Sequence, residues 1–271
     1  MRVDLHVHTS LCRHAEGTAA EMAEAARAAG LDVVAITDHL PLPPGFDPGY
    51  AMGADELEAY VSEVLVAAEG MRSAGGPEVL LGIEADWLPG AEERVGDAVA
   101  AYPFDVVLGS VHFLDGWAFD DPRLAGEWDR RDAGDVWRAY FGRLCAAARS
   151  GLFDAMAHPD LVKKFGHRPG FDALPLYEEA ASVFAGAGVA VEVNTAGLRK
   201  PVGEAYPSLD FLAACRRAGV SVVTGSDAHH PLEVGFRLDA AEELLRAAGY
   251  ESIAVVRGRR IEEIPMGVAR R

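Results

Sequence analysis

Short apolar runs rich in β-branched residues alternate with longer Ala-rich stretches along the chain. We expect seven strands, at residues 2–7, 32–37, 78–84, 105–111, 153–157, 189–193 and 220–224. The helical stretches fall at residues 19–29, 54–74, 91–101, 133–150, 176–187, 208–218 and 232–248. The pattern therefore predicts seven consecutive strand–helix units in a single domain spanning residues 1–271.

Local signals support these boundaries and narrow the architecture. Thr18 and Glu21 have the spacing of a capping box, which predicts that the first helix begins at that point. Several strands are apolar throughout, which is typical of a parallel sheet covered by helices. A closed (β/α) barrel and an open doubly wound sheet both fit. Because His6 and His8 stand where a dinucleotide-binding sheet would carry its glycine-rich turn, we favour the barrel.

Charge and composition exclude several classes of protein. The chain has 25 basic and 42 acidic side chains and a formal net charge of −17, which disfavours binding to nucleic acid. No apolar run is long enough to cross a membrane or to act as a signal peptide, so we expect a cytoplasmic protein. The three cysteines fit reduced thiols, and the role of Cys12, which lies among histidines, is left open.

Polar side chains that can bind metals follow nearly every predicted strand. They are His6 and His8, Asp38 and His39, Glu84 and Asp86, His112, His158, Asn194, and Asp227 and His229. The C-terminal ends of barrel strands converge on one face, so we expect these side chains to lie close together at that face. A lone histidine at a strand end is more often an ordinary hydrogen-bonded residue, but so many at such positions indicate a site for more than one ion. Nitrogen and oxygen donors suit Zn, Mn or Fe.

These residues also stand in motifs that resemble those of the PHP (polymerase and histidinol phosphatase) superfamily. The motifs are His6-Val7-His8, Thr37-Asp38-His39, Glu84, Ser110-Val111-His112, His158-Pro159 and Ser226-Asp227-Ala228-His229. Residues 109–113, 158–161 and 193–200 look, more narrowly, like the histidinol-phosphate phosphatase branch of that superfamily.

The resemblance implies a distorted (β/α)7 barrel, an α/β fold, with three divalent metal ions at the C-terminal face of its strands. One ion would be held by His6, His8 and Asp227, and Glu84 would bridge it to a second ion at His112 and His158. The third ion would be held by His14, His39 and His229. The chemical identity of the three ions remains open.

The activity implied is hydrolysis of L-histidinol phosphate to L-histidinol and phosphate, a step of histidine biosynthesis. The nucleophile would be a hydroxide bridging two of the ions. The candidate catalytic residues are Glu84, Asp227 and Asp38. Of these, Asp227 or Asp38 would protonate the leaving group, unless a second metal-bound water does so. Arg199 is the preferred phosphate ligand because a guanidinium matches two phosphate oxygens, with Lys163 and His230 as further substrate contacts.

Three alternatives compete with this hypothesis. The first is a PHP phosphoesterase that acts on nucleotides or short oligonucleotides, which the acidity of the chain disfavours. The second is a non-catalytic metal-bound module, which should have lost ligands. The third is an amidohydrolase barrel, which commonly uses a lysine at a strand end, whereas Glu84 occupies that place here. The oligomeric state stays open.

Overall fold

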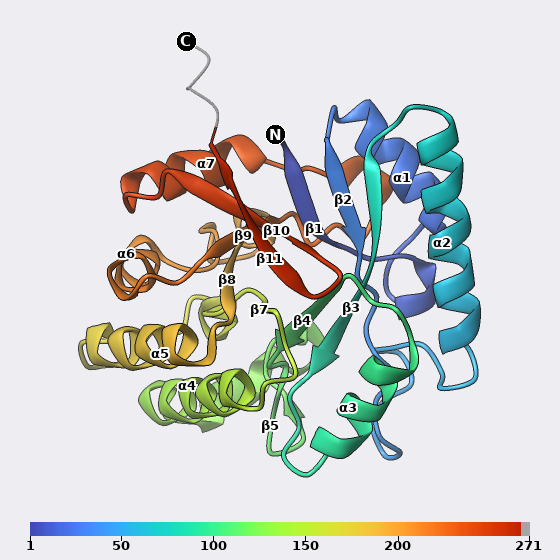
Figure 1. Cartoon of the computed structure of the whole chain (residues 1–271). Coiled ribbons are helices and arrows are strands. Elements are labelled where there is room, and N and C mark those ends of the chain that lie inside the picture. The colour runs from blue at the N-terminus through green and yellow to red at the C-terminus, as the bar shows by residue number, and fades with distance from the viewer. Residues whose placement is uncertain (267–271) are drawn as a thin grey trace.

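Seven parallel strands lie side by side in chain order and curl into a nearly closed barrel (Figure 1). They are β1 (Val3–Val7), β2 (Val33–Ile36), β3 (Glu78–Asp86), β4 (Val106–Ser110), β7 (Ala155–Met156), β8 (Ala190–Asn194) and β9 (Val222–Gly225). A bridge between Val7 and Ala228 joins the first strand to the end of the last. This computed structural model describes residues 1–266, so the last five residues of the predicted domain lie outside the described part.

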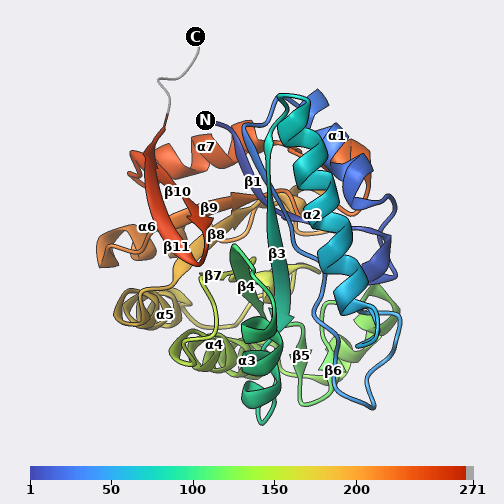
Figure 2. The ribbon, with the colours of Figure 1, turned by 45° about the vertical axis from the view of Figure 1, so that its right-hand side comes forward.

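Within residues 1–266, seven α-helices surround the barrel, as Figures 1 and 2 let the reader follow. They are α1 (Ala19–Ala28), α2 (Leu57–Ser73), α3 (Glu92–Ala101), α4 (Ala133–Arg149), α5 (Leu174–Ala187), α6 (Leu209–Ala218) and α7 (Leu238–Ala247). The capping box of Thr18 and Glu21 is present at the start of α1, as predicted. The strands are almost entirely buried because the helices cover their outer face. The predicted (β/α)7 barrel is therefore confirmed.

The last helix begins six residues later than predicted. Gly235 and Arg237 have φ angles of 73° and 48°, a left-handed conformation that interrupts any helix across them. Residues Pro231–Glu233 instead form a 3₁₀ turn, η5, and α7 starts at Leu238. Four other 3₁₀ segments follow strands or loops: η1 (Ser10–Cys12), η2 (Pro122–Arg130), η3 (Leu161–Lys163) and η4 (Ala196–Arg199).

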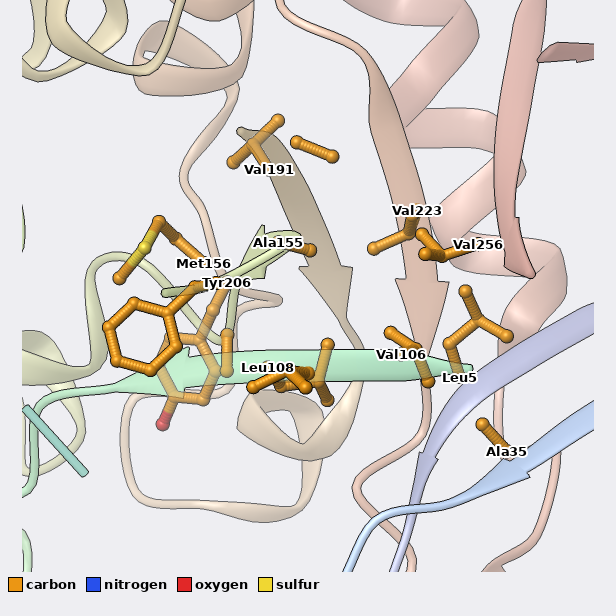
Figure 3. Close-up of a cluster of buried hydrophobic side chains, with 14 of the residues drawn as sticks. Leu5, Ala35, Val106, Leu108, Ala155, Met156, Val191, Tyr206, Val223 and Val256 are labelled. Atoms are coloured by element: carbon orange, nitrogen blue, oxygen red, sulfur yellow. The ribbon is translucent and has the colours of Figure 1, made fainter. Parts of the chain in front are cut away.

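Two antiparallel hairpins are present that the pattern did not predict. The short pair β5 (Phe113–Leu114) and β6 (Trp117–Ala118) follows β4, on the side where the strands end. The longer pair β10 (Ser252–Arg257) and β11 (Arg260–Pro265) lies where the strands begin, and Val256 packs beside Val223 in the core (Figure 3). Among residues 1–266, no helix is both long and apolar enough to cross a membrane.

Candidate metal centre and cavity

The Glu84 carboxylate, near the end of β3, lies at the centre of a cluster of imidazoles. Its Oε2 atom is 3.1 Å from His39 Nδ1, 3.3 Å from His6 Nε2 and 3.4 Å from His8 Nε2. Its Oε1 atom is 3.0 Å from His158 Nε2 and 3.7 Å from His112 Nε2. These side chains lie near or just after the C-terminal ends of five strands, β1, β2, β3, β4 and β7, as the convergence of strand ends in a barrel requires.

Asp227 and two further histidines extend the cluster. Asp227 Oδ1 is 3.4 Å from both His8 Nε2 and His229 Nδ1. The His14 ring lies 4.8 Å from the His229 ring, between centroids. Several sets of three side chains bring their ligand atoms within 4.8 Å of one another. They include His6, His8 and Asp227; His6, Glu84 and His158; His8, His39 and Glu84; and His14, His39 and His229. The structure thus brings together all nine expected metal ligands.

The donor set fits divalent metal ions. Several buried side-chain atoms at this point have no hydrogen-bond partner: His6 Nε2, both ring nitrogens of His8, His39 Nδ1, His158 Nδ1 and Glu84 Oε2. A buried polar atom left without a hydrogen-bond partner costs about 1–3 kcal/mol of stability. Six such atoms in one place therefore indicate that they bind a ligand. Lone pairs of imidazole and carboxylate converging on one volume are the ligands that Zn, Mn and Fe take in proteins.

The electrostatics keep the central carboxylates ionised. Burial opposes the charged form of Glu84, but His39 and His6 hold its pKa well below the usual range. Burial likewise opposes ionisation of Asp227, whose pKa is held well below its usual range by His6 and His8. Both groups are therefore anionic at neutral pH, the form that binds a cation.

Buried carboxylates orient the histidine rings from behind. Glu192, in the middle of β8, is 2.8 Å from His6 Nδ1, and its other oxygen accepts from the backbone N–H of His158 at 2.7 Å. Asp86 lies 3.0 Å from His112 Nδ1; although burial disfavours charge, Asp86 raises the pKa of His112 to about 10. Such contacts fix which ring nitrogen faces a metal.

The sequence interpretation missed Glu192, although a signal was present. It is the one charged residue of the buried strand β8, whose other residues are apolar apart from Asn194 at its end. Room for it is made by Gly225 on the neighbouring strand, where a Cβ atom would lie 2.0 Å from Glu192 Oε1. A charged residue inside a buried strand needs a partner, so its position could have indicated the site.

Two of the expected ligands sit on strained backbone. His158 and Asp227 have φ angles of 28° and 52°, a region that residues with a side chain rarely adopt. The loop of Asp227 is held by Arg199, whose Nη2 donates to the carbonyls of Ser226 and Asp227, and by Asp4, which accepts from Ser226 N at 2.8 Å. Strain that is held in this way is typical of functional sites.

The cluster opens into a cavity of about 600 Å³ lined by both cationic and anionic side chains. The cations on its wall are Arg13, Arg123, Lys164 and Lys200. Lys164 Nζ lies 2.9 Å from Asp120 Oδ2, which lines the same wall. The cavity therefore combines the metal-binding cluster with positive groups that suit a phosphate.

The three expected substrate contacts do not line this cavity. Lys163 is fully buried, and its Nζ binds Asp160 and the carbonyl of Ala205. Arg199 Nη2 donates to the carbonyls of Ser226 and Asp227 and its Nε lies 3.3 Å from Glu233 Oε1, whereas its buried Nη1 has no hydrogen-bond partner. His230 Nδ1 accepts from the N–H of Leu232, so its ring caps η5.

Asp38 lies behind the histidines, away from the cavity wall. Its two oxygens accept from the Thr9 backbone N–H at 2.6 Å and from the Thr9 hydroxyl at 2.5 Å, and Oδ1 is 3.8 Å from His8 Nδ1. Burial and the nearby Cys12 raise the pKa of Asp38 to about 7. Of the two expected aspartate acids, only Asp227 lines the cavity.

Comparison with known proteins adds relatives along almost the whole chain. A probable histidinol-phosphatase of Deinococcus radiodurans is 46% identical over 248 residues, which cover 91% of this chain and 94% of the relative. The histidinol-phosphatase of Bacillus subtilis is 28% identical over 270 residues, and the match covers 88% of this chain and 97% of the relative.

The fold is shared with a solved structure. The histidinol phosphate phosphatase of Lactococcus lactis, crystallised with zinc, L-histidinol and phosphate, superposes with a TM-score of 0.83 at 20% identity, over 96% of this chain and 98% of the other. The model of the PHP domain matches residues 4–196, which include seven of the nine clustered side chains. With that match and the 46% identical relative, this chain belongs to the PHP domain family.

Proposed function

We propose that this chain is a metal-dependent phosphomonoesterase that hydrolyses L-histidinol phosphate to L-histidinol and phosphate. The observation that carries the proposal is the Glu84 carboxylate, which five imidazoles surround within 3.7 Å at the wall of a cavity with four cationic side chains. The histidinol-phosphatases of Deinococcus radiodurans and Bacillus subtilis, related over nearly their full length, support this substrate.

Three divalent ions, of Zn, Mn or Fe, fit the clustered donors. His6, His8 and Asp227 would hold one ion, His112 and His158 would hold a second with Glu84 as a ligand shared by the two, and His14, His39 and His229 would hold the third. When bound, such ions supply a water of lowered pKa as the nucleophile and neutralise charge on the phosphoryl oxygens.

The cationic side chains of the wall bind and orient the phosphate group. Lys164 and Lys200 lie on the cavity wall, whereas Lys163 and Arg199 are engaged in internal contacts. We therefore assign phosphate binding to Lys164 and Lys200, and assign Arg199 to holding the loop that carries Asp227. Because the transition state of phosphoryl transfer is loose, positioning and charge stabilisation of this kind account for most of catalysis.

The remaining wall suits the cationic, aromatic part of histidinol. Phe113 and Tyr50 line the cavity and lie edge to face, with centroids 5.5 Å apart. Asp121 and Asp120 supply carboxylates on the same wall, and Asp121 accepts from the Tyr50 hydroxyl. An imidazole can stack on such rings while an ammonium group binds a carboxylate. Asp227 faces the cavity, but it is ionised and would hold a metal ion, so a metal-bound water remains as the candidate to give a proton to the leaving oxygen.

Product release from a substrate panel tests the proposal, measured as phosphate for the monoesters and as cleaved product for the oligonucleotide and the amide. The purified protein, loaded in turn with zinc, manganese or iron, is offered histidinol phosphate, nucleoside monophosphates, a short oligonucleotide and an amide substrate. We expect rapid release from histidinol phosphate and little from the others. Product release only from the nucleotides or the oligonucleotide would contradict histidinol phosphate as the substrate and favour a nucleotide phosphoesterase. A protein that binds metal but hydrolyses none of the substrates would favour the non-catalytic module.

A further inference from the structure

A sulfur atom lies inside the imidazole cluster. One ligand atom each of His8, Cys12 and His229 lies within 4.8 Å of the others, a spacing that a single ion can span. Cys12 is fully buried, so its thiol is not a surface group. Neither the expected set of nine ligands nor the substrate contacts proposed above include it.

The chain holds Cys12 in this place by a defined turn. Cys12 ends the 3₁₀ segment η1, where its N–H donates to the carbonyl of Thr9 at 3.1 Å. The Thr9 hydroxyl accepts from the N–H of Leu11 at 3.2 Å, and Thr9 is itself bound by the carboxylate of Asp38. Arg13, next along the chain, takes a left-handed conformation with φ of 75° and closes the turn. The sulfur is therefore positioned by several contacts rather than by chance packing.

The neighbouring ring provides a second observation. His8 is fully buried, and neither of its ring nitrogens has a hydrogen-bond partner. Its ring stacks on that of His229 with centroids 4.4 Å apart. One ring nitrogen of each histidine lies within 4.8 Å of the other and of the Cys12 sulfur. A buried imidazole without partners, beside a buried thiol and another imidazole, is a donor set for a metal ion.

We propose that Cys12 Sγ is a further ligand of the third ion, the one assigned above to His14, His39 and His229, which His8 flanks on the other side; that position of the centre is then a nitrogen and sulfur site. The proposal rests on the metal centre of the proposed function. On binding, the thiol loses its proton to solvent and the sulfur gives an electron pair to the ion, so uptake of metal releases a proton. Thiolate is a soft donor, so this position should prefer zinc or iron to manganese or magnesium.

X-ray absorption of the zinc-loaded protein tests the sulfur directly. We expect a sulfur shell at about 2.3 Å from zinc besides the nitrogen and oxygen shell at about 2.0–2.2 Å. The sulfur shell should be lost in Cys12→Ser and retained in Cys215→Ser, a matched control because Cys215 is equally buried but lies in α6. A wild-type protein with nitrogen and oxygen scatterers alone overturns the inference, and so does a sulfur shell that survives Cys12→Ser.

A cobalt-loaded sample gives an independent readout that needs no variant. A sulfur ligand produces an intense near-ultraviolet charge-transfer band from sulfur to cobalt, which we expect in the wild type; its absence overturns the inference. Metal content and phosphate release are measured on the same samples. A protein that binds metal and hydrolyses histidinol phosphate without the sulfur signal overturns the role of Cys12 alone, whereas one that binds no divalent ion overturns the proposed function.

Discussion

The two ends of strand β3 carry one glutamate each, in opposite surroundings. Glu78, the first residue, is exposed and binds Arg257 of β10, with Oε2 2.6 Å from Nη2. Glu84, six residues later, is buried and its neighbours within 4 Å include five imidazoles. The same contrast holds for the whole barrel. The end where the strands begin is closed by the β10–β11 hairpin (Figures 1 and 2), whereas the residues at the end where the strands finish line the cavity.

The closed end satisfies its polar groups from within. Arg259, at the hairpin turn, binds the carboxylate of Asp154 at 2.5 Å and the carbonyl of Leu152 at 2.7 Å. Its backbone N–H donates to the carbonyl of Asp105. At the open end, buried nitrogens and a carboxylate oxygen stay without partners. The difference teaches that one end serves stability and the other keeps its binding capacity for ligands.

Removal of divalent ions should have the largest effect and should act on the open end alone. We expect a chelator to abolish phosphate release and zinc, manganese or iron to restore it. Because the ions bind the folded state, free metal at a hundred times its dissociation constant adds about 2.7 kcal/mol of stability, which chelation removes. Calorimetry with and without chelator checks this, and activity that survives complete metal removal contradicts the account.

The two glutamates of β3 provide a matched pair of variants. Glu84→Gln removes the central charge, so we expect loss of bound metal and a fall in kcat of about a thousandfold or more. Glu78→Gln changes only a surface ion pair and should cost less than about 1 kcal/mol of stability with unchanged metal content. Metal analysis and steady-state kinetics compare them. Equal activity of the two variants would break the contrast between the ends.

The cavity lysines should affect substrate binding more than turnover. Charged hydrogen bonds contribute about 1.5–3 kcal/mol, so Lys164→Met and Lys200→Met should each raise KM for histidinol phosphate about 10- to 100-fold. Both cations lie on the cavity wall. Arg199→Met should instead lower metal affinity, because Arg199 holds the carbonyls of Ser226 and Asp227. A large rise in KM for Arg199→Met with full metal content would reverse this assignment.

The closed end should respond in stability only. Arg259→Ala leaves Asp154 without its cationic partner, and we expect a loss of about 2 kcal/mol in the free energy of unfolding. The kcat and KM of the folded protein should not change, since the hairpin lies where strands begin. Denaturant unfolding together with kinetics below the transition tests this, and altered kinetics would show that the two ends are coupled.

Most of the fold could be predicted from the sequence because each strand is a short apolar run between helices. The C-terminal hairpin was missed, although its two strands flank a two-residue turn at Gly258 and Arg259. The predicted start of the last helix is wrong because two residues in the left-handed conformation, Gly235 and Arg237, interrupt a segment with helical composition. Both errors concern backbone conformation that residue type alone does not fix.

The clustering of the nine proposed metal ligands could be predicted because strand ends of a barrel converge. Which basic residues line the cavity could not be predicted, because neighbouring residues of a turn face different ways: Lys163 points into the core and Lys164 into the cavity. The direction of Arg199 depends on carbonyls of a loop almost thirty residues later. Such choices are made by tertiary contacts and leave no local pattern.

Crystals grown with zinc and measured at the zinc absorption edge test the central claim most directly. We expect anomalous peaks within about 2.0–2.2 Å of imidazole nitrogens and carboxylate oxygens of the cluster around Glu84 and Asp227. A protein saturated with zinc whose peaks lie only on the surface, with the cluster empty, would contradict the account.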